Sequence, residues 1–180
     1  MQGIIFTTLA EMIEEKFDLR TLQIILDKAQ LEDDAFVSTS IYPDSSLVRI
    51  VESASEVSGI AVPDLVRSYG EYLFGHFVEM HEDMIIEAGN LKNFLLQIDS
   101  VIHVEVSKLY PGSSLPIFEY EDIDERHLVM IYKSPRKMCH LAEGLVAGAA
   151  NYFNKKFVLK QTQCMHLGSD QCHLEISIEG

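Results

Sequence analysis

Apolar residues recur at helical spacing three times within the first 60 residues. In each case the side chains lie three, four or seven positions apart, which places them on one face of an α-helix. The three predicted helices cover residues 4–16, 21–29 and 45–58. Glu32–Asp34 is a polar break between the second helix and the third. The pattern predicts a helical lobe over residues 1–60 that packs on the rest of the chain.

A fourth predicted helix begins at Pro63, because proline is favoured in the first turn, and it runs through Phe77. Residues 90–110 then carry the most regular helical pattern of the chain. One apolar stripe of this segment contains Leu91, Phe94, Leu95, Ile98, Ile102 and Leu109, and the other contains Leu96, Val106 and Tyr110. His103 lies on the second stripe. Two apolar stripes predict a helix that is buried on two sides and ends at Pro111-Gly112.

Strand patterns appear in the last third of the chain. The apolar run Leu128–Tyr132 predicts a buried strand, and residues 137–153 predict a helix whose small residues permit close packing. Residues 157–163 and 172–178 predict two further strands. The order predicts a single α+β domain of 180 residues. In this domain an N-terminal helical lobe packs on a C-terminal lobe, residues 61–180, that contains an antiparallel sheet and helices.

The composition favours an acidic, cytoplasmic protein. The formal net charge is −14 and the pI is about 4.8, so nucleic acid and anionic membranes are disfavoured as partners and a basic protein surface is favoured. The longest apolar run is too short to span a bilayer, and Met1–Phe6 lacks the basic and apolar regions of a signal peptide. Three cysteines are too few, and odd in number, for a secreted disulfide framework, so they are expected as thiols or metal ligands.

His103 is a candidate metal ligand. Its imidazole is expected on an apolar face of the predicted helix, and neutral imidazole is a strong ligand for haem iron. A lone histidine on such a face is more often a hydrogen-bonded core residue. The helix alone therefore leaves both interpretations open.

Tyr132, Ser134 and Arg136 form a second candidate site directly after the apolar strand. In extended chain, residues two apart point the same way, and Pro135 favours extended geometry at Ser134. Two hydroxyls and a guanidinium group suit a pair of carboxylates, such as haem propionates. The alternative is a strand end with an ordinary surface arginine.

Six short motifs follow one another along the chain. They are Met1-x-Gly3-x-Ile5, Val101-Ile102-His103, Tyr110-Pro111, Leu115-Pro116, Tyr132-x-Ser134-x-Arg136 and Ala142-Glu143-Gly144-Leu145. Their order and spacing resemble the haem–nitric oxide/oxygen binding family, the H-NOX domains, over essentially the whole chain. The resemblance implies that haem b lies between the two lobes with His103 as the proximal iron ligand. It also implies that Tyr132, Ser134 and Arg136 clamp the propionates, whereas Ile5 and Pro116 press on the haem and keep it non-planar.

The resemblance places the gas ligand on the side of the haem opposite His103. Oxygen-binding members of the family hold a tyrosine hydroxyl there, and the matching residue in this chain is Leu141. An apolar pocket withholds the hydrogen bond that stabilises bound O₂, so NO and CO are the expected ligands. Further residues expected to line this pocket, although core packing alone also explains them, are Leu145, Phe74, Phe77 and Val78. Exclusion of O₂ is in doubt if a nearby histidine faces the iron, the candidates being His76, His81 and His140.

Cys139, Cys164 and Cys172 form a third candidate site. Cys164 and Cys172 lie symmetrically about Gly168, so they are expected to face each other in a hairpin that turns there. Relatives with a similar cysteine set hold zinc with a histidine at the position that is Gln161 here, so the resemblance implies an incomplete set of zinc ligands. The donors left open for the fourth position are His166, His140, His173, a Gln161 oxygen or a water. The alternative is a group of inert buried thiols.

The leading interpretation is a haem-based nitric oxide sensor that is not itself an enzyme. The resemblance implies that NO weakens the iron–His103 bond until it breaks, and that the N-terminal lobe then shifts. No kinase, cyclase or methyl-accepting segment is recognised, so the output is expected in trans on a histidine kinase or a cyclic-di-GMP enzyme, the partners of stand-alone bacterial members. The alternative is a redox sensor, based on the cysteines or on zinc, that acts on the same kind of partner.

Two other classes fit the sequence less well. A haem peroxidase needs a distal acid–base pair, and a pocket built around Leu141 supplies none. Other small-molecule-binding domains with a cysteine-rich hairpin lack the combination of His103 with Tyr132-x-Ser134-x-Arg136.

Overall fold

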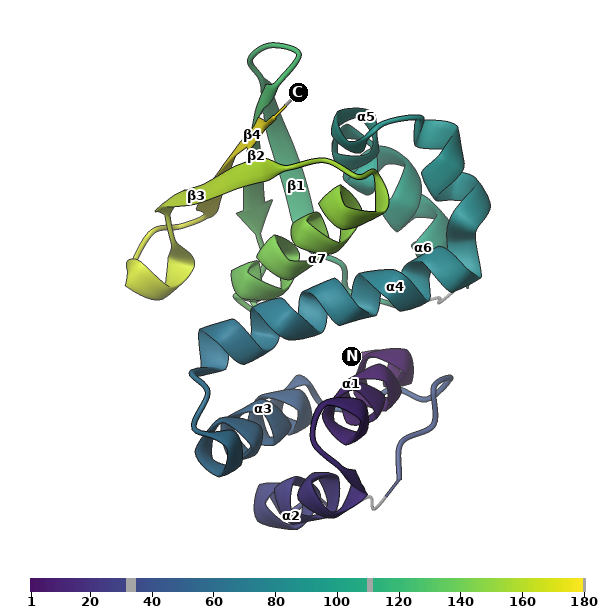
Figure 1. Cartoon of the computed structure of the whole chain (residues 1–180), viewed down its shortest axis with the longest axis vertical. Helices are drawn as coiled ribbons and strands as arrows, with labels where there is room; N and C mark the ends of the chain where they lie inside the picture. Colours follow the sequence, from purple (N-terminus) through teal and green to yellow (C-terminus); the bar gives the residue numbers. More distant parts are fainter. Residues whose placement is uncertain (32–34, 110–111, 180) are drawn as a thin grey trace.

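Three helices build the N-terminal lobe, which lies on one side of a long central helix (Figure 1). They are α1 (Gly3–Lys16), α2 (Leu19–Ala29) and α3 (Asp44–Ser58), in agreement with the three predicted ranges. Their apolar faces meet in one core that includes Phe6, Ile25 and Leu47.

The structure is a computed structural model that describes residues 1–31, 35–109 and 112–179. The predicted polar break at Glu32–Asp34 and the motif residues Tyr110–Pro111 lie outside the described residues.

The central helix α4 (Val62–Ala88) belongs to two hydrophobic cores. Its first half contributes to the core of the N-terminal lobe, through Leu65, Tyr69 and Leu73. Its second half contributes to the core of the C-terminal lobe, through Phe74, Ile85 and Ala88. The two cores therefore share α4, which begins just after residue 60, where the N-terminal lobe was predicted to end.

The helix α4 bends at His81, whose backbone leaves helical geometry with φ −140° and ψ 34°. Neither proline nor glycine stands at this position, so the usual sequence signals for a kink are missing. Beyond the kink the last turns lead toward α5 (Figure 1). Although α4 has 27 residues, no helix of the described residues combines the length and the apolar character that a membrane span requires.

The described part of the C-terminal lobe contains a four-stranded antiparallel sheet in the order β1-β2-β4-β3. Its strands are β1 (Ile117–Asp122), β2 (His127–Lys133), β3 (Phe157–Gln163) and β4 (Cys172–Ile178). The helix α7 (Cys139–Tyr152) packs between this sheet and α4 (Figure 1). The predicted strands correspond to β2, β3 and β4. The edge strand β1 was missed, because only Phe118 and Tyr120 alternate inward among its acidic residues.

The prediction of one regular helix over residues 90–110 was wrong. The described part of this segment forms α5 (Leu91–Leu96), a π-helical turn η1 (Ile98–Ile102) and α6 (His103–Leu109). In the π turn the Ile102 amide donates to the Gln97 carbonyl, five residues back, at 3.1 Å, and this extra residue interrupts both apolar stripes. The Phe118 amide of β1 donates to Asp99 Oδ1 within this turn, at 3.3 Å. A tertiary contact of this kind, which periodicity does not encode, accounts for the break.

The helices α4 and α7 cross at two glycines. A Cβ atom on Gly144 would lie 2.1 Å from the Arg67 carbonyl oxygen and 2.9 Å from the Gly70 Cα. A Cβ atom on Gly70 would lie 2.4 Å from the Leu141 carbonyl oxygen. The two helices therefore meet backbone to backbone, and this contact sets where the first turns of α7 lie relative to α4.

Gly144→Ala is expected to destabilise the protein by about 1–3 kcal/mol, because the added methyl group must push two helix backbones apart. For a chain of this size the melting temperature should fall by about 3–10 °C in a circular dichroism melt. Gly75→Ala, also on α4, is the matched control, since nothing lies within 4 Å of its Cβ position and alanine is the better helix former. Equal melting temperatures for the two variants would contradict the close crossing.

Candidate functional site

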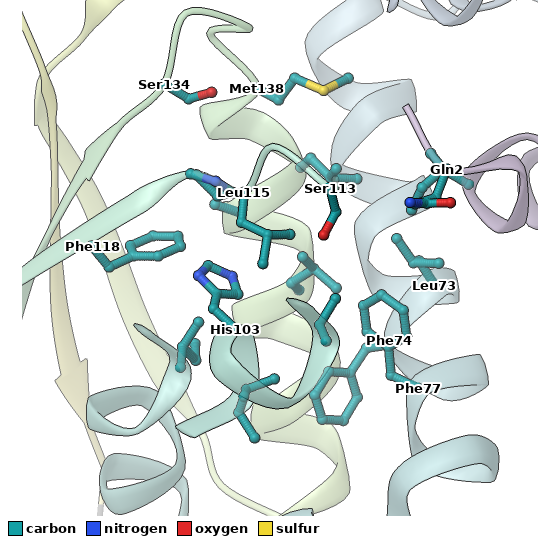
Figure 2. A pocket seen from close by; sticks show the side chains of 18 of the residues that line it. Gln2, Leu73, Phe74, Phe77, His103, Ser113, Leu115, Phe118, Ser134 and Met138 are labelled. Atoms are coloured by element: carbon teal, nitrogen blue, oxygen red, sulfur yellow. The ribbon is translucent and has the colours of Figure 1, made fainter. Parts of the chain in front are cut away.

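A cavity of about 280 Å³ lies where the two lobes meet (Figure 2). Side chains from the start of α1, from α4, from α7 and from the segment between η1 and β1 line it. Most of them are apolar, and the polar groups are few. Such a lining is typical of a pocket that holds a large apolar ligand and orients it with a small number of polar contacts.

His103 reaches the cavity as the first residue of α6, directly after the π turn. Its imidazole lies beside the Phe118 ring, with a centroid separation of 5.8 Å, while Phe74 and Phe77 stand across the cavity from it (Figure 2). Nδ1 of His103 lies 3.4 Å from Asp99 Oδ1. Burial lowers the pKa of His103, although the Asp99 carboxylate acts in the opposite direction. A neutral ring whose Nδ1–H donates to Asp99 has a free lone pair on Nε2, which is the form that binds a metal.

Tyr132, Ser134 and Arg136 all line the cavity. The Tyr132 hydroxyl accepts a hydrogen bond from the Met138 amide at 2.8 Å, and burial raises the pKa of this phenol, so it stays protonated. Ser134 is buried, and its Oγ accepts from the Arg136 amide at 3.3 Å. The structure thus brings these three residues to one cavity, and the backbone positions both hydroxyls. Their contact with propionates stays a prediction.

Arg136 also joins the two lobes through Asp44, a residue that the sequence analysis missed. Nε of Arg136 donates to Asp44 Oδ2 at 2.6 Å, and Nη1 donates to the Ser114 carbonyl. The other oxygen of Asp44 lies 3.1 Å from the amino group of Met1. Partial burial acts to raise the pKa of Asp44, but hydrogen bonds from Arg136 and the amino terminus outweigh it and lower that pKa. In the sequence, Asp44 reads only as an acidic residue in the first turn of a helix.

Much of the cavity lining that α7 and α4 provide is apolar. Leu141 and Leu145 line it from α7, and Phe74 and Phe77 line it from α4. Ile5 and Pro116 also line the cavity, from α1 and from the loop before β1. Val78 does not belong to the lining and packs against the core of the C-terminal lobe instead.

Of the three histidines considered as polar groups near the gas ligand, one lines the cavity and two do not. His81, at the kink of α4, lines the cavity. His76 lies 3.6 Å from Glu11 and 3.9 Å from Glu79, outside the cavity lining. His140 lies 3.1 Å from the Glu143 carboxylate, also outside it.

The loop before β1 contributes a polar group that the sequence did not reveal. The Ser113 hydroxyl is buried with no hydrogen-bond partner among the described residues, and it points into the cavity (Figure 2). Gln2 and Met138 also line the cavity without having been predicted. No periodic signal marks these residues, because each lies at the edge of an element or in a loop.

The three cysteines are brought together as predicted. Their sulfur atoms lie within 4.8 Å of one another, at the start of α7 and on the two sides of the β3–β4 turn. All three residues are buried free thiols, and burial raises the pKa of Cys139 and of Cys172. A second group, formed by Cys139, His140 and His166, also has its donor atoms within 4.8 Å of one another.

Comparison with known proteins agrees with this geometry. The sequence matches the haem-NO-binding (HNOB) family over residues 2–161. The H-NOX protein of S. oneidensis in its Fe(II)NO state is 32% identical, covers 100% of both chains and superposes with a TM-score of 0.94. The unliganded Fe(II) H-NOX protein of K. algicida is 28% identical, covers 100% of this chain and 97% of its own, and has a TM-score of 0.90.

A curated relative is longer. The soluble guanylate cyclase gcy-37 of Caenorhabditis elegans is 30% identical over 156 residues, which make up 83% of this chain and 22% of that protein. The chain thus spans about a fifth of the length of that relative.

The chain therefore belongs to the haem-NO-binding family and is an H-NOX domain, a haem-based gas sensor. H-NOX domains bind haem and gaseous ligands such as NO and CO, signal to partner proteins and are usually not catalytic themselves. The residues of this cavity fit a haem. The free Nε2 of His103 suits a bond to iron, and the apolar walls suit a porphyrin. The Arg136 guanidinium suits propionates, as does the Ser113 hydroxyl, which has no hydrogen-bond partner among the described residues.

Asp99→Asn is expected to lower the iron–histidine stretching frequency of the ferrous protein in resonance Raman spectra. The amide is neutral, so it supports less electron donation from His103 to the iron than the carboxylate does. Haem loss should also become about 10- to 100-fold faster. Asp83→Asn removes the same charge from an exposed position on α4 and serves as the control. If the frequency stays the same in Asp99→Asn, the carboxylate has no influence on the iron ligand.

Proposed function

We propose that this domain is a bacterial, cytoplasmic nitric oxide sensor that holds ferrous haem b through His103 alone. The open position on the iron takes NO and CO and excludes O₂, and the domain regulates a separate signalling protein. The observation that supports this proposal is the largely apolar lining of the cavity, to which Leu141 contributes. By the family resemblance this leucine replaces the hydrogen-bond donor that stabilises bound O₂.

His81 is the residue that bears most on ligand choice, because it is polar and lines the same cavity. It lies at the kink of α4 between Met80 and Met84, which also line the cavity, and not on α7 beside Leu141. The exclusion of O₂ that we propose requires that His81 does not donate a hydrogen bond to the gas ligand.

A haem held by His103 would supply a ferrous iron able to bind a diatomic gas. His103 is the first residue of α6, so any change in its hold on the iron acts directly on the end of that helix. Arg136 contacts both Asp44 of α3 and the cavity. A change near Arg136 in the cavity is therefore transmitted through Asp44 to the N-terminal lobe.

The partner that we propose is a histidine kinase or a cyclic-di-GMP enzyme that acts in trans. The net charge of −14 favours a partner with a basic docking surface. The α1–α3 lobe, tied to Arg136 through Asp44, is the part of the domain through which we expect the signal to leave.

A second candidate function is a redox sensor with the same kind of partner. The observation that favours it is the triad of sulfur atoms within 4.8 Å of one another, a separation that permits disulfide formation after modest movement. It predicts a response to oxidant that does not require His103.

The absorption spectrum of the purified ferrous protein tests the gas-sensing proposal. We expect a five-coordinate spectrum that air leaves unchanged and that NO shifts, and we expect His103→Ala to lose the haem or to alter its spectrum. If no haem is bound even when haem is supplied during expression, the proposal fails and the redox function becomes the better one. A stable complex with O₂ would overturn the pocket argument, and its loss in His81→Leu would identify His81 as the donor.

Leu141→Tyr is expected to make O₂ binding detectable, because it places a phenol O–H donor on the apolar wall. One hydrogen bond of about 1–2 kcal/mol corresponds to an affinity gain of roughly 5- to 30-fold, and the gain should appear as a slower O₂ dissociation rate in stopped-flow measurements. Leu141→Phe has a similar ring without the hydroxyl and should show no gain. A gain of the same size in both variants would mean that ring size, and not hydrogen bonding, controls the affinity for O₂.

A further inference from the structure

Tyr69 is a buried phenol on α4 that lies outside the cavity lining. Its side chain is 1% exposed and belongs to the core of the N-terminal lobe. Its hydroxyl donates to the Ile5 carbonyl at 2.6 Å. Burial, and to a lesser extent the charge of Glu11, raise the pKa of Tyr69 well above its ordinary value, so the phenol keeps the proton that it donates. The hydrogen bond therefore joins α4 to the first turn of α1, 64 residues away in the sequence.

The carbonyl that Tyr69 binds belongs to a residue whose side chain lines the cavity. Ile5 lies in the first turn of α1, and its neighbours Gln2 and Ile4 line the cavity as well. A buried hydroxyl without a partner is costly, so this bond is kept as long as α1 and α4 stay packed together. Tyr69 thus sets where Ile5 stands relative to α4, and it does so without lining the cavity itself.

The loop before α3 holds the start of α1 through backbone contacts. The Gly3 amide donates to the Ser40 carbonyl at 2.7 Å. A Cβ atom on Gly3 would lie 1.9 Å from the Val37 carbonyl oxygen, so the loop and the helix start touch backbone to backbone. These contacts stay within the N-terminal lobe, whereas Tyr69 connects the same turn to the helix that both cores share.

The residue after Tyr69 makes the corresponding contact with the C-terminal lobe. Gly70 packs so closely on α7 that a Cβ atom there would lie 2.4 Å from the Leu141 carbonyl oxygen. Leu141, like Ile5, lines the cavity. Two consecutive residues of α4 thus contact the backbones of two lining residues, one from each lobe. Removal of the Tyr69 hydroxyl would release Ile5 and leave the contact with Leu141 in place.

We propose that the Tyr69 hydroxyl is a positioning group for the haem. By holding the first turn of α1 against α4, it keeps the Ile5 side chain pressed on the porphyrin. This role rests on the proposed function, in which the cavity holds a haem that Ile5 contacts. Distortion of the macrocycle is one of the means by which a protein tunes a haem. A group that fixes the position of Ile5 therefore influences the haem without touching it.

Tyr69→Phe removes one oxygen atom and keeps the ring, so it isolates the hydrogen bond. In resonance Raman spectra of the ferrous protein, the out-of-plane modes that report porphyrin distortion should lose intensity, and the reduction potential of the haem should shift. Amide hydrogen exchange over residues 3–9 should become roughly 2- to 10-fold faster, as the loss of one buried hydrogen bond predicts.

Tyr72→Phe is the matched control. Tyr72 lies one turn further along α4, and its hydroxyl bonds to Glu15 near the other end of α1. This bond also ties α1 to α4, but neither residue lines the cavity. The Raman spectrum and the reduction potential of Tyr72→Phe should therefore match those of the wild type, even where its melting temperature falls as far as that of Tyr69→Phe.

The Ile5→Ala variant shows whether Tyr69 acts through Ile5. Removal of the Ile5 side chain alone should weaken the same Raman modes. Adding Tyr69→Phe to this variant should then change the spectrum little, because the side chain that the hydroxyl positions is already gone.

Two results with the haem-loaded protein would overturn the role of Tyr69. Equal spectra and potentials in Tyr69→Phe and Tyr72→Phe would leave the bond with a purely structural role. Independent, additive effects of Tyr69→Phe and Ile5→Ala would show that Tyr69 does not act through Ile5. Absence of haem from the wild type is distinguishable from both, because it would overturn the gas-sensing proposal and the role of Tyr69 toward the haem together.

Discussion

The imidazole of His103, placed in a largely apolar cavity, is the constraint on which the rest of the gas site depends. Burial keeps His103 neutral, but a buried polar ring is costly unless a fixed partner satisfies one of its nitrogens. Asp99 is that partner, and the Phe118 amide of the edge strand holds Asp99 in turn. The π turn and the first residues of β1 thus act together to orient one ring. The irregular backbone of the π turn thus helps to fix the direction of the His103 ring.

Both lobes contribute side chains to the lining of the cavity. The first half of α4 packs in the N-terminal core, and its second half packs in the C-terminal core. Arg136 of the C-terminal lobe contacts Asp44 of the N-terminal lobe. A ligand that enters the cavity is therefore in contact with both lobes at once. Coupling between ligand state and lobe arrangement follows from this shared construction, because differential contacts in two arrangements are what allow a ligand to shift an equilibrium.

Much of this architecture could be predicted from the sequence, and the exceptions share a physical cause. The helices of the N-terminal lobe and the strands β2, β3 and β4 have a strong periodicity set by one buried face. Spacing made His103 and the motif Tyr132-x-Ser134-x-Arg136 candidates, but only the family resemblance gave them a role, and the structure places them along one cavity. The π turn, the kink at His81, Asp44 and Ser113 were not predicted, because contacts between distant segments determine them. Val78 was expected in the cavity lining from its place on the same helix as Phe74 and Phe77, but it packs against the core of the C-terminal lobe.

The crossing of α4 and α7 has a mechanical consequence. Side-chain ridges seated in grooves normally fix the rotation of one helix against another. At Gly70 and Gly144 the backbones touch with no side chains between them, so the distance between the two axes is fixed there. Beside this point Arg67 of α4 pairs with Glu143 of α7, and further along Asn151 of α7 donates to Glu71 of α4. The two helices are thus tied at more than one place along their length, and a displacement of α7 carries with it the half of α4 that packs in the N-terminal lobe.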